Sequence, residues 1–147
     1  MQKHDDDFFM NEALKEAQKA FEKDEVPIGS VIVCKEKIIA RGYNLTQTLT
    51  DATAHAEMQA ITSASEFLGN KYLNECTLYV TLEPCTMCAG ALFWSQIGKI
   101  VYGADDPKRG YRLLGENVLH PKTQVVKGIL AKNCSTIIKN FFIKKRN

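Results

Sequence analysis

The sequence predicts an α/β fold, with a mixed, five-stranded sheet covered by helices on both faces. Segments with apolar residues at helical spacing alternate along the chain with short runs of β-branched residues. Consecutive β-α units favour neighbouring parallel strands, whereas two adjacent β-rich runs favour an antiparallel hairpin at the sheet edge. The chain has 147 residues and is 45% hydrophobic, so we expect a single domain over residues 1–147.

The first half of the chain is expected to form a helix, a hairpin and a second helix. Apolar residues of the first segment recur at helical spacing. Two β-rich runs follow, separated by three charged residues that suit a turn. In the second helix, Thr53 or Asp51 is the expected N-terminal cap, and Gly69 lies just past the end. The expected ranges are 6–23 for the first helix, 26–44 for the hairpin and 53–68 for the second helix.

The second half is expected to add three strands and two helices. The composition of the third strand indicates that both of its faces are buried. Pro84 ends this strand, and the helix that follows is expected to close at Gly98. Two further short strands and a terminal helix complete the chain. The expected ranges are 76–82, 99–104 and 123–128 for the strands, and 86–96 and 129–146 for the helices.

Composition indicates in which compartment the protein works and whether it associates with a membrane. No apolar run approaches the ~20 residues that a membrane span requires, and the acidic N-terminal segment indicates neither a signal peptide nor an anchor. Two of the five cysteines form a C-x-x-C pair. In a chain without secretory features, this pair points to reduced thiols and to metal or redox chemistry. We therefore expect a cytoplasmic protein without membrane association.

Charge is distributed unevenly along a chain whose net charge is +2. Residues 1–26 carry eight acids against four lysines, whereas residues 107–147 carry ten Lys or Arg and one acid, Glu116. Such a basic segment can face a polyanion. A solvated helix end explains the same pattern, since helix C-termini favour Lys and Arg. The charge pattern leaves both interpretations open.

Three residues offer ligands for one zinc ion. His55 lies near the start of one expected helix, and Cys85 and Cys88 lie at the start of another. In α/β sheets, ligands collect where helices begin. Zinc prefers imidazole and thiolate ligands, and helix N-termini help to keep thiols deprotonated. A structural zinc ion has four protein ligands, whereas a catalytic one keeps three and leaves a position for water.

Glu57 stands two residues after His55 and is the expected catalytic residue. Zinc lowers the pKa of its bound water to roughly 7. Glu57 would be close enough to take a proton from that water, and it could then deliver the proton to the substrate and to a leaving group. Ala56 between them is small and leaves its backbone N–H free for a bound ligand.

Other interpretations of these residues stay open. The C-x-x-C pair could be a redox pair, and Glu57 an ordinary first-turn acid. The three remaining cysteines are expected to be small core residues. A purely structural zinc ion would need a fourth ligand from residues that are not adjacent in the sequence, namely Cys34, Cys76, Cys134, His4 or His120.

H-x-E followed by P-C-x-x-C is the signature of zinc-dependent nucleobase deaminases. It reads HAE at 55–57 and PCTMC at 84–88. Over almost its whole length the chain also resembles bacterial tRNA-specific adenosine deaminases. The blocks that carry this resemblance are EVPIG at 25–29, Asn44, TAHAEMQA at 53–60, CTLYVTLEPCTMCAGA at 76–91, VYGADDPKRG at 101–110 and the ending FFIKKR.

The resemblance implies a fold, a reaction and partners. The fold would be the cytidine-deaminase-like three-layer α/β/α arrangement, with one Zn²⁺ bound by His55, Cys85 and Cys88 and with Glu57 as the proton shuttle. The reaction would be hydrolytic deamination of adenosine to inosine at the wobble position of a tRNA anticodon. Members are homodimers that bind the anticodon stem-loop at the subunit boundary. The alternatives are a deaminase of a free nucleobase or nucleoside (cytosine, guanine or cytidine) and a zinc-stabilised binding module.

By the same resemblance, four residues would contact the substrate: Asn44, Ile28, Pro27 and Ala56. Asn44 would hydrogen-bond the flipped nucleotide. Ile28 and Pro27 would form an apolar wall against the base, and Ala56 would add a backbone contact. The alternative is that Asn44 only stabilises a turn, and that Pro27 and Ile28 are buried residues at the start of a strand.

One loop departs from the family pattern, because bulky residues occupy 111–114 where small residues are expected. Aromatic and basic side chains there could stack on and clamp an RNA loop. The possible RNA contacts in this loop and at the chain end are Lys108, Arg109, Tyr111, Arg112, Lys144, Lys145 and Arg146.

Overall fold

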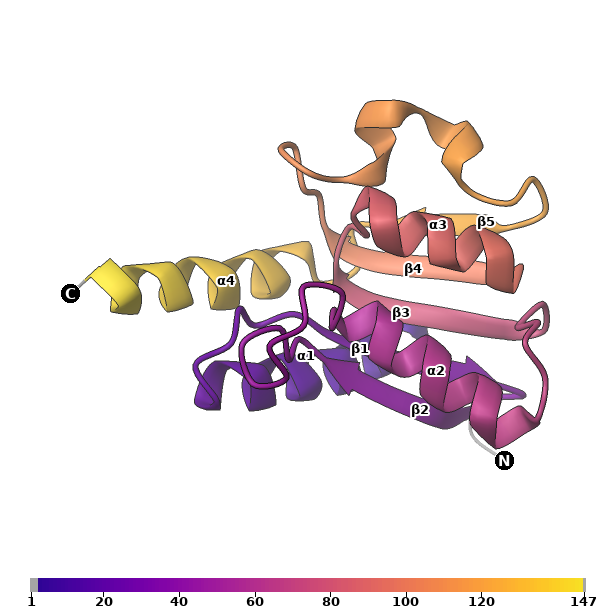
Figure 1. Cartoon of the computed structure of the whole chain (residues 1–147), viewed down its shortest axis with the longest axis horizontal. Helices are drawn as coiled ribbons and strands as arrows, with labels where there is room; N and C mark the ends of the chain where they lie inside the picture. Colours follow the sequence, from indigo (N-terminus) through magenta and orange to yellow (C-terminus); the bar gives the residue numbers. More distant parts are fainter. Residues whose placement is uncertain (1–2, 147) are drawn as a thin grey trace.

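The computed structural model describes residues 3–146 (Figure 1). Helices and strands follow one another in the predicted order, and two short 3-10 helices occupy a segment that was expected to be a loop. The elements are α1 (Asp6–Glu22), β1 (Gly29–Cys34), β2 (Lys37–Tyr43), α2 (Ala56–Leu68), β3 (Cys76–Leu82), α3 (Thr86–Ser95), β4 (Lys99–Ala104), η1 (Tyr111–Leu114), η2 (Glu116–Val118), β5 (Gln124–Lys127) and α4 (Ala131–Arg146).

The strands form one mixed sheet in the order β2-β1-β3-β4-β5. β1 pairs antiparallel with β2 and with β3, whereas β3 with β4 and β4 with β5 are parallel pairs. The predicted antiparallel hairpin at the edge is confirmed. Because β2 and β3 run in the same direction, their carboxyl ends lie at one edge of the sheet, where α2 and α3 begin.

Helices cover both faces of the sheet, which gives three layers (Figure 1). Successive side chains of a strand point to opposite faces. Ile32 and Leu78 therefore pack in the core beneath α2 and α3, whereas Val31 and Tyr79 pack against α1 and α4. Both faces of β3 are buried, as its composition predicted. None of the helices in the described range is both long and apolar enough to cross a membrane.

The start of α2 differs from the prediction. His55 is the N-cap residue and the helix begins at Ala56, so neither Thr53 nor Asp51 is the cap. The Asp51 carboxylate instead accepts hydrogen bonds from the backbone N–H and the hydroxyl of Thr53. These bonds shape the turn that leads into the helix. Gly69 is the C-cap, in the left-handed conformation, as predicted.

Two other helix ends also differ. α3 ends at Ser95, with Gln96 as its C-cap at φ 55°, rather than being closed by Gly98. An added Cβ at Gly98 would lie 2.4 Å from the carbonyl oxygen of Asn74, so close backbone packing accounts for this glycine. α4 begins at Ala131 instead of residue 129, because Leu130 before it adopts a positive φ of 54°.

Gly42 lets α2 approach β2 closely at the start of the helix. An added Cβ at Gly42 would lie 2.4 Å from the carbonyl oxygen of Ala56. The Ser30 hydroxyl donates a hydrogen bond of 2.8 Å to that same oxygen. The first turn of α2, which carries His55 and Glu57, is therefore fixed on the hairpin by backbone contacts.

Candidate active site

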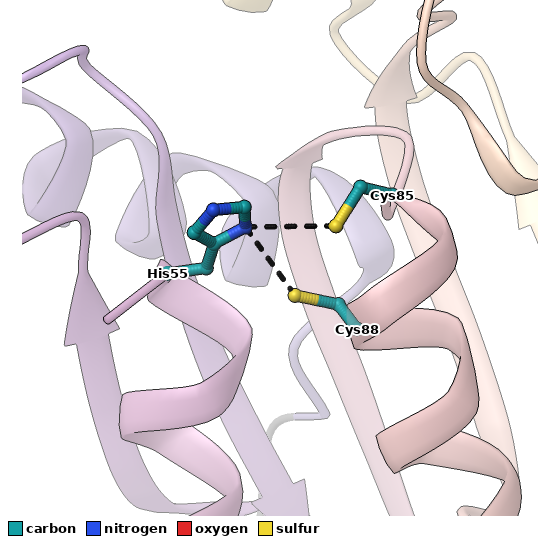
Figure 2. Close-up of side chains that lie close together, drawn as sticks. All are labelled: His55, Cys85 and Cys88. Atoms are coloured by element: carbon teal, nitrogen blue, oxygen red, sulfur yellow. Dashed lines mark hydrogen bonds between the residues drawn. The ribbon is translucent and has the colours of Figure 1, made fainter. Parts of the chain in front are cut away.

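The candidate site lies where α2 and α3 begin. His55 is the N-cap residue of α2, Cys85 is the N-cap residue of α3, and Cys88 lies in the first turn of α3. Neither N-cap side chain makes a capping hydrogen bond, and helix N-termini favour negative charge. Figure 2 shows the three side chains pointing toward one another. The structure thus brings together the three residues that the sequence predicted as ligands.

The spacing of the three ligand atoms fits one tetrahedral metal ion. His55 Nδ1 lies 3.6 Å from Cys85 Sγ and 3.5 Å from Cys88 Sγ (Figure 2), and all three atoms lie within 4.8 Å of one another. Zinc with Zn–S bonds of about 2.3 Å and a Zn–N bond of about 2.0 Å would separate tetrahedral N and S ligands by about 3.5 Å. The geometry and the donor types therefore fit zinc.

The group of possible ligands has three protein members. Within residues 3–146, none of the five residues considered as a fourth ligand belongs to it. Cys134, for example, is buried between α1, α4 and the opposite face of the sheet. Three ligands correspond to a catalytic zinc site, which keeps a position for water, and not to a closed structural one.

Electrostatics at the two sulfurs favour a bound cation. A hydrogen bond with Cys88 and then one with His55 lower the pKa of Cys85 to about 4. The pKa of Cys88 is raised by the same hydrogen bond and by burial. The two pKa shifts are opposite because the hydrogen bond between the sulfurs favours the thiolate of Cys85 and the thiol of Cys88. A divalent metal ion would stabilise both thiolates at once, because a coordinating thiol is deprotonated.

Glu57 lies beside the ligands, and its residue surface is only 4% exposed. Burial raises the pKa of its carboxyl group to about 7, and the nearby Cys85 sulfur adds to the rise. A carboxyl group with a pKa near neutrality can both accept and donate a proton at the pH of the cell. This environment suits the predicted proton shuttle.

The predicted substrate contacts lie on the strand entry and the loop next to α2. Asn44 is buried, its Nδ2 donates to the carbonyl oxygen of Val26, and its Oδ1 accepts from the backbone N–H of Thr46. Its backbone N–H donates to the carbonyl oxygen of Ile28. Asn44 thus fills the turn role that the sequence left as an alternative, with one Nδ2 proton still available. Pro27 is buried and Ile28 is half-buried.

Glu25 holds the loop between β2 and α2 and was not identified from the sequence as a functional residue. Its side chain is fully buried. The carboxylate accepts hydrogen bonds from the backbone N–H groups of Gln47 and Thr48, at 3.1 and 2.6 Å, and from the Thr48 hydroxyl at 2.7 Å. Glu25 therefore fixes the segment that follows Asn44 and leads to His55.

Glu83 plays a similar part on the other side of the site and was also missed. Its carboxylate is buried and accepts hydrogen bonds from the backbone N–H groups of Asp106, at 3.0 Å, and Arg112, at 3.1 Å. The N–H of Tyr111 donates to the carbonyl oxygen of Pro84. These bonds hold the loop after β4 against the turn that carries Cys85. The only signal in the sequence was an acid directly before P-C-x-x-C, and neither its burial nor its partners could be read there.

The predicted RNA contacts in this loop fall into two groups. Lys108 and Arg109 are exposed. Tyr111 is fully buried, so its ring is not placed to stack on an RNA base, which corrects that expectation. Arg112 donates a hydrogen bond of 3.0 Å to Asp105 and forms an ion pair with Glu83, with Nε 3.6 Å from Oε2. The bulky residues of the loop form η1, in which Tyr111 packs inward.

Comparisons with known proteins identify the class to which this fold and site belong. A family model described as MafB19-like deaminase matches residues 4–146. The solved structure of a guanine deaminase from Nitrosomonas europaea aligns over 96% of this chain and 86% of its own, with a TM-score of 0.84. At 21% identity, that likeness shows the fold alone. The chain has the fold and the residue group of a cytidine-deaminase-like deaminase.

More similar proteins define the family within this class. A tRNA-specific adenosine deaminase from Bacillus subtilis (strain 168) is 47% identical over 146 residues, which are 96% of this chain and 91% of the relative. A structure from a study of A-to-I editing by tRNA deaminases at the wobble position is 44% identical, with a TM-score of 0.83, and the alignment covers 88% of this chain and 98% of the other. The chain belongs to the tRNA-specific adenosine deaminase family.

Proposed function

We propose that this protein, as a single deaminase domain, hydrolyses adenosine to inosine and ammonia at the wobble position of a tRNA anticodon. The observation that carries the proposal is the three-ligand group of His55, Cys85 and Cys88 with the buried Glu57 beside it. Zinc, when bound there, would supply an activated water. Glu57 would accept a proton from the water and deliver it first to the purine ring nitrogen and then to the departing amine.

The residues around the start of α2 would position the base. Asn44 keeps one Nδ2 proton for an acceptor on the nucleotide, and the half-buried Ile28, next to the buried Pro27, offers apolar surface. The first turn of α2 begins at Ala56 and has no side-chain cap, which leaves backbone N–H groups for the ligand. Glu25 and Glu83 would hold the flanking loops and act only as positioning residues.

Ammonia release from defined substrates tests this function. Zinc-loaded protein is expected to release ammonia from a tRNA with adenosine at the wobble position. A transcript that differs only by guanosine at that position serves as the control and should release none. Free adenine, guanine, cytosine and cytidine should also be inert. If the protein instead deaminates a free base or nucleoside and leaves tRNA unchanged, the alternative function, a deaminase of free nucleobases or nucleosides, would be established.

We further propose that the protein is a cytoplasmic homodimer. All five cysteines are free thiols, which is typical of proteins in reducing compartments. Exposed apolar residues occur on α3 and on η1, where Trp94 is 77%, Leu113 61% and Leu114 70% exposed. Exposed apolar surface of this kind marks interaction sites. A second copy of the chain covering this surface would place a subunit boundary beside the candidate site.

Trp94→Glu is expected to convert the dimer to a monomer, because a charge at the centre of an apolar interface would be buried without a partner. Sedimentation velocity over a range of protein concentrations measures this change. Phe67→Glu is the matched control, since Phe67 is 70% exposed on α2 and lies outside the proposed surface. A wild-type protein that stays monomeric, or a Trp94→Glu variant that stays dimeric, would contradict the proposed interface.

The basic end of α4 is proposed to contact the RNA backbone. Phe141 is buried, and its ring packs edge-on against Phe21 of α1, with centroids 5.8 Å apart. Docking of this aromatic residue leaves Lys144, Lys145 and Arg146 on the exposed side. Figure 1 shows α4 extending past the ends of the strands. The end of α4 is thus docked through its aromatic residue, with the three basic side chains exposed and Lys145 paired with Asp24.

Replacing Lys144, Lys145 and Arg146 together by glutamine is expected to raise the Michaelis constant for tRNA and to leave the rate at saturating tRNA nearly unchanged. Each lost phosphate contact should reduce the slope of log affinity against log salt by about 0.7 to 0.9. Binding titrations and kinetics at several salt concentrations measure both quantities. Lys145 also pairs with Asp24, so Asp24→Asn is the control that breaks this pair without removing positive charge. An unchanged salt slope in the triple variant would move the RNA surface to Lys108 and Arg109.

A further inference from the structure

Cys34 and Cys76 form a close pair at the end of the sheet opposite to the candidate active site. Cys34 is the last residue of β1, Cys76 is the first residue of β3, and the two are direct partners on these antiparallel strands. The backbone N–H of Cys76 donates to the carbonyl oxygen of Leu73, so the pair does not exchange two ladder hydrogen bonds. In such non-hydrogen-bonded pairs, the Cα atoms lie about 4.5 Å apart and the side chains are closest.

The two sulfurs point to the same side of the sheet and can meet. Cys76 belongs to the core beneath α2 and α3, Cys34 packs against that core, and both line one groove of about 450 Å³. Burial, and then a hydrogen bond with the Cys34 sulfur, raise the pKa of Cys76 to about 12. A disulfide needs Cα atoms about 4.4 to 6.8 Å apart. The strand pairing therefore already provides the separation that a disulfide requires.

The thiols differ in how easily a reagent reaches them. Cys34 is half-buried, whereas Cys76 is 2% exposed. Lys35 and Lys37 line the same groove, together with one acid, Glu75. Positive charge beside the groove attracts a reagent that bears carboxylates. Cys34 is thus placed to react first and Cys76 to react second.

We propose that Cys34 and Cys76 are a dithiol that closes reversibly to a cross-strand disulfide by exchange with a small, carboxylate-bearing disulfide. The Cys34 thiolate attacks one sulfur of the reagent, whose S–S bond breaks and releases one thiolate. Cys76 then gives up its proton and attacks the Cys34 sulfur of the mixed disulfide, which releases the second thiol. Two protein thiols are oxidised, and one reagent disulfide is reduced to two thiols.

The disulfide would stabilise the segment that carries half of the candidate site. It closes a loop over residues 35–75, which contains His55 and Glu57. A cross-link across a loop of this length restricts the unfolded chain. The bond itself lies at the far ends of β1 and β3 from the site, so the catalytic rate should not change. Oxidation would therefore act as a protective, reversible stabilisation of the fold.

Peptide mapping of the full-length, zinc-loaded protein after incubation with oxidised glutathione tests the proposal. Free thiols are blocked by alkylation before digestion. We expect a linkage between the Cys34 and Cys76 peptides, a rise in Tm of roughly 10 °C, an unchanged catalytic rate, and reversal by a phosphine reductant.

Two single variants distinguish closure from adventitious oxidation. Cys76→Ser should stop at a stable glutathione adduct on Cys34, whereas Cys34→Ser should give neither adduct nor linkage. Cys134→Ser is the matched control and should form the linkage as the wild-type protein does. Two results would overturn the proposal. One is a disulfide between Cys85 and Cys88 while Cys34 and Cys76 are both fully alkylated. The other is a glutathione adduct on Cys34 of the wild-type protein that never proceeds to the disulfide.

Discussion

Glu57→Ala is expected to lose deamination by a factor of about 10² to 10⁴, the contribution of general acid–base catalysis, while zinc content stays near that of the wild-type protein. The three N and S ligands account for the metal without the carboxylate. Proton transfer has no other candidate in the group, and the Glu57 carboxyl group has its pKa raised to about 7 by burial. Initial rates of inosine formation and elemental analysis of zinc per subunit measure the two effects.

Glu57→Gln is the matched variant, because it keeps the volume and polarity of the buried side chain but cannot carry the proton. We expect it to be as inactive as the alanine variant and as stable as the wild-type protein. Loss of zinc from either variant would show that Glu57 is a ligand and that its role as proton shuttle is wrong.

Cys88→Ser is expected to lose zinc, activity and stability together. Cys88 is fully buried, and its sulfur is one of three ligand atoms. Metal binding energy is partly folding energy, and at a zinc concentration of about 1,000 times Kd the bound ion contributes about 4 kcal/mol to the free energy of unfolding. Thermal unfolding with and without a chelator, together with zinc analysis, measures this coupling.

Cys134→Ser is the control for Cys88→Ser, since Cys134 is also fully buried but packs among α1, α4 and the sheet. Cys134→Ser should destabilise the protein only because it buries a hydroxyl group. Its zinc content, and the change in Tm caused by the chelator, should equal those of the wild-type protein. Equal loss of zinc from both variants would refute the ligand assignment.

The order of helices and strands was predictable because local patterns determine it. Helix starts were less predictable, and the reason lies in the site. Side-chain caps of Ser, Thr, Asp or Asn are preferred at helix N-termini, which made Thr53 and Asp51 the expected caps. The structure instead places His55 and Cys85 at the two N-cap positions, with their side chains turned toward each other. Local rules fail most often where function occupies the position.

The metal group was predictable because short spacings bring its residues to two helix starts. The supporting residues were not, because their roles depend on contacts between distant parts of the chain. Glu83 bonds to backbone groups 23 and 29 residues away. Tyr111 is drawn into the core next to the bridge between Cys85 and Gly110. The sequence next to Tyr111 does not reveal that bridge. Its aromatic side chain was therefore interpreted as an exposed residue that stacks on RNA.

Sequencing of total tRNA after incubation with the zinc-loaded protein tests the proposed activity most directly. Inosine pairs as guanosine does, so an edited adenosine is sequenced as guanosine. We expect A-to-G changes at the wobble position of the anticodon with the wild-type protein, and no change with Glu57→Ala. Wobble adenosines that remain unchanged in the presence of fully zinc-loaded wild-type protein would contradict the proposed function.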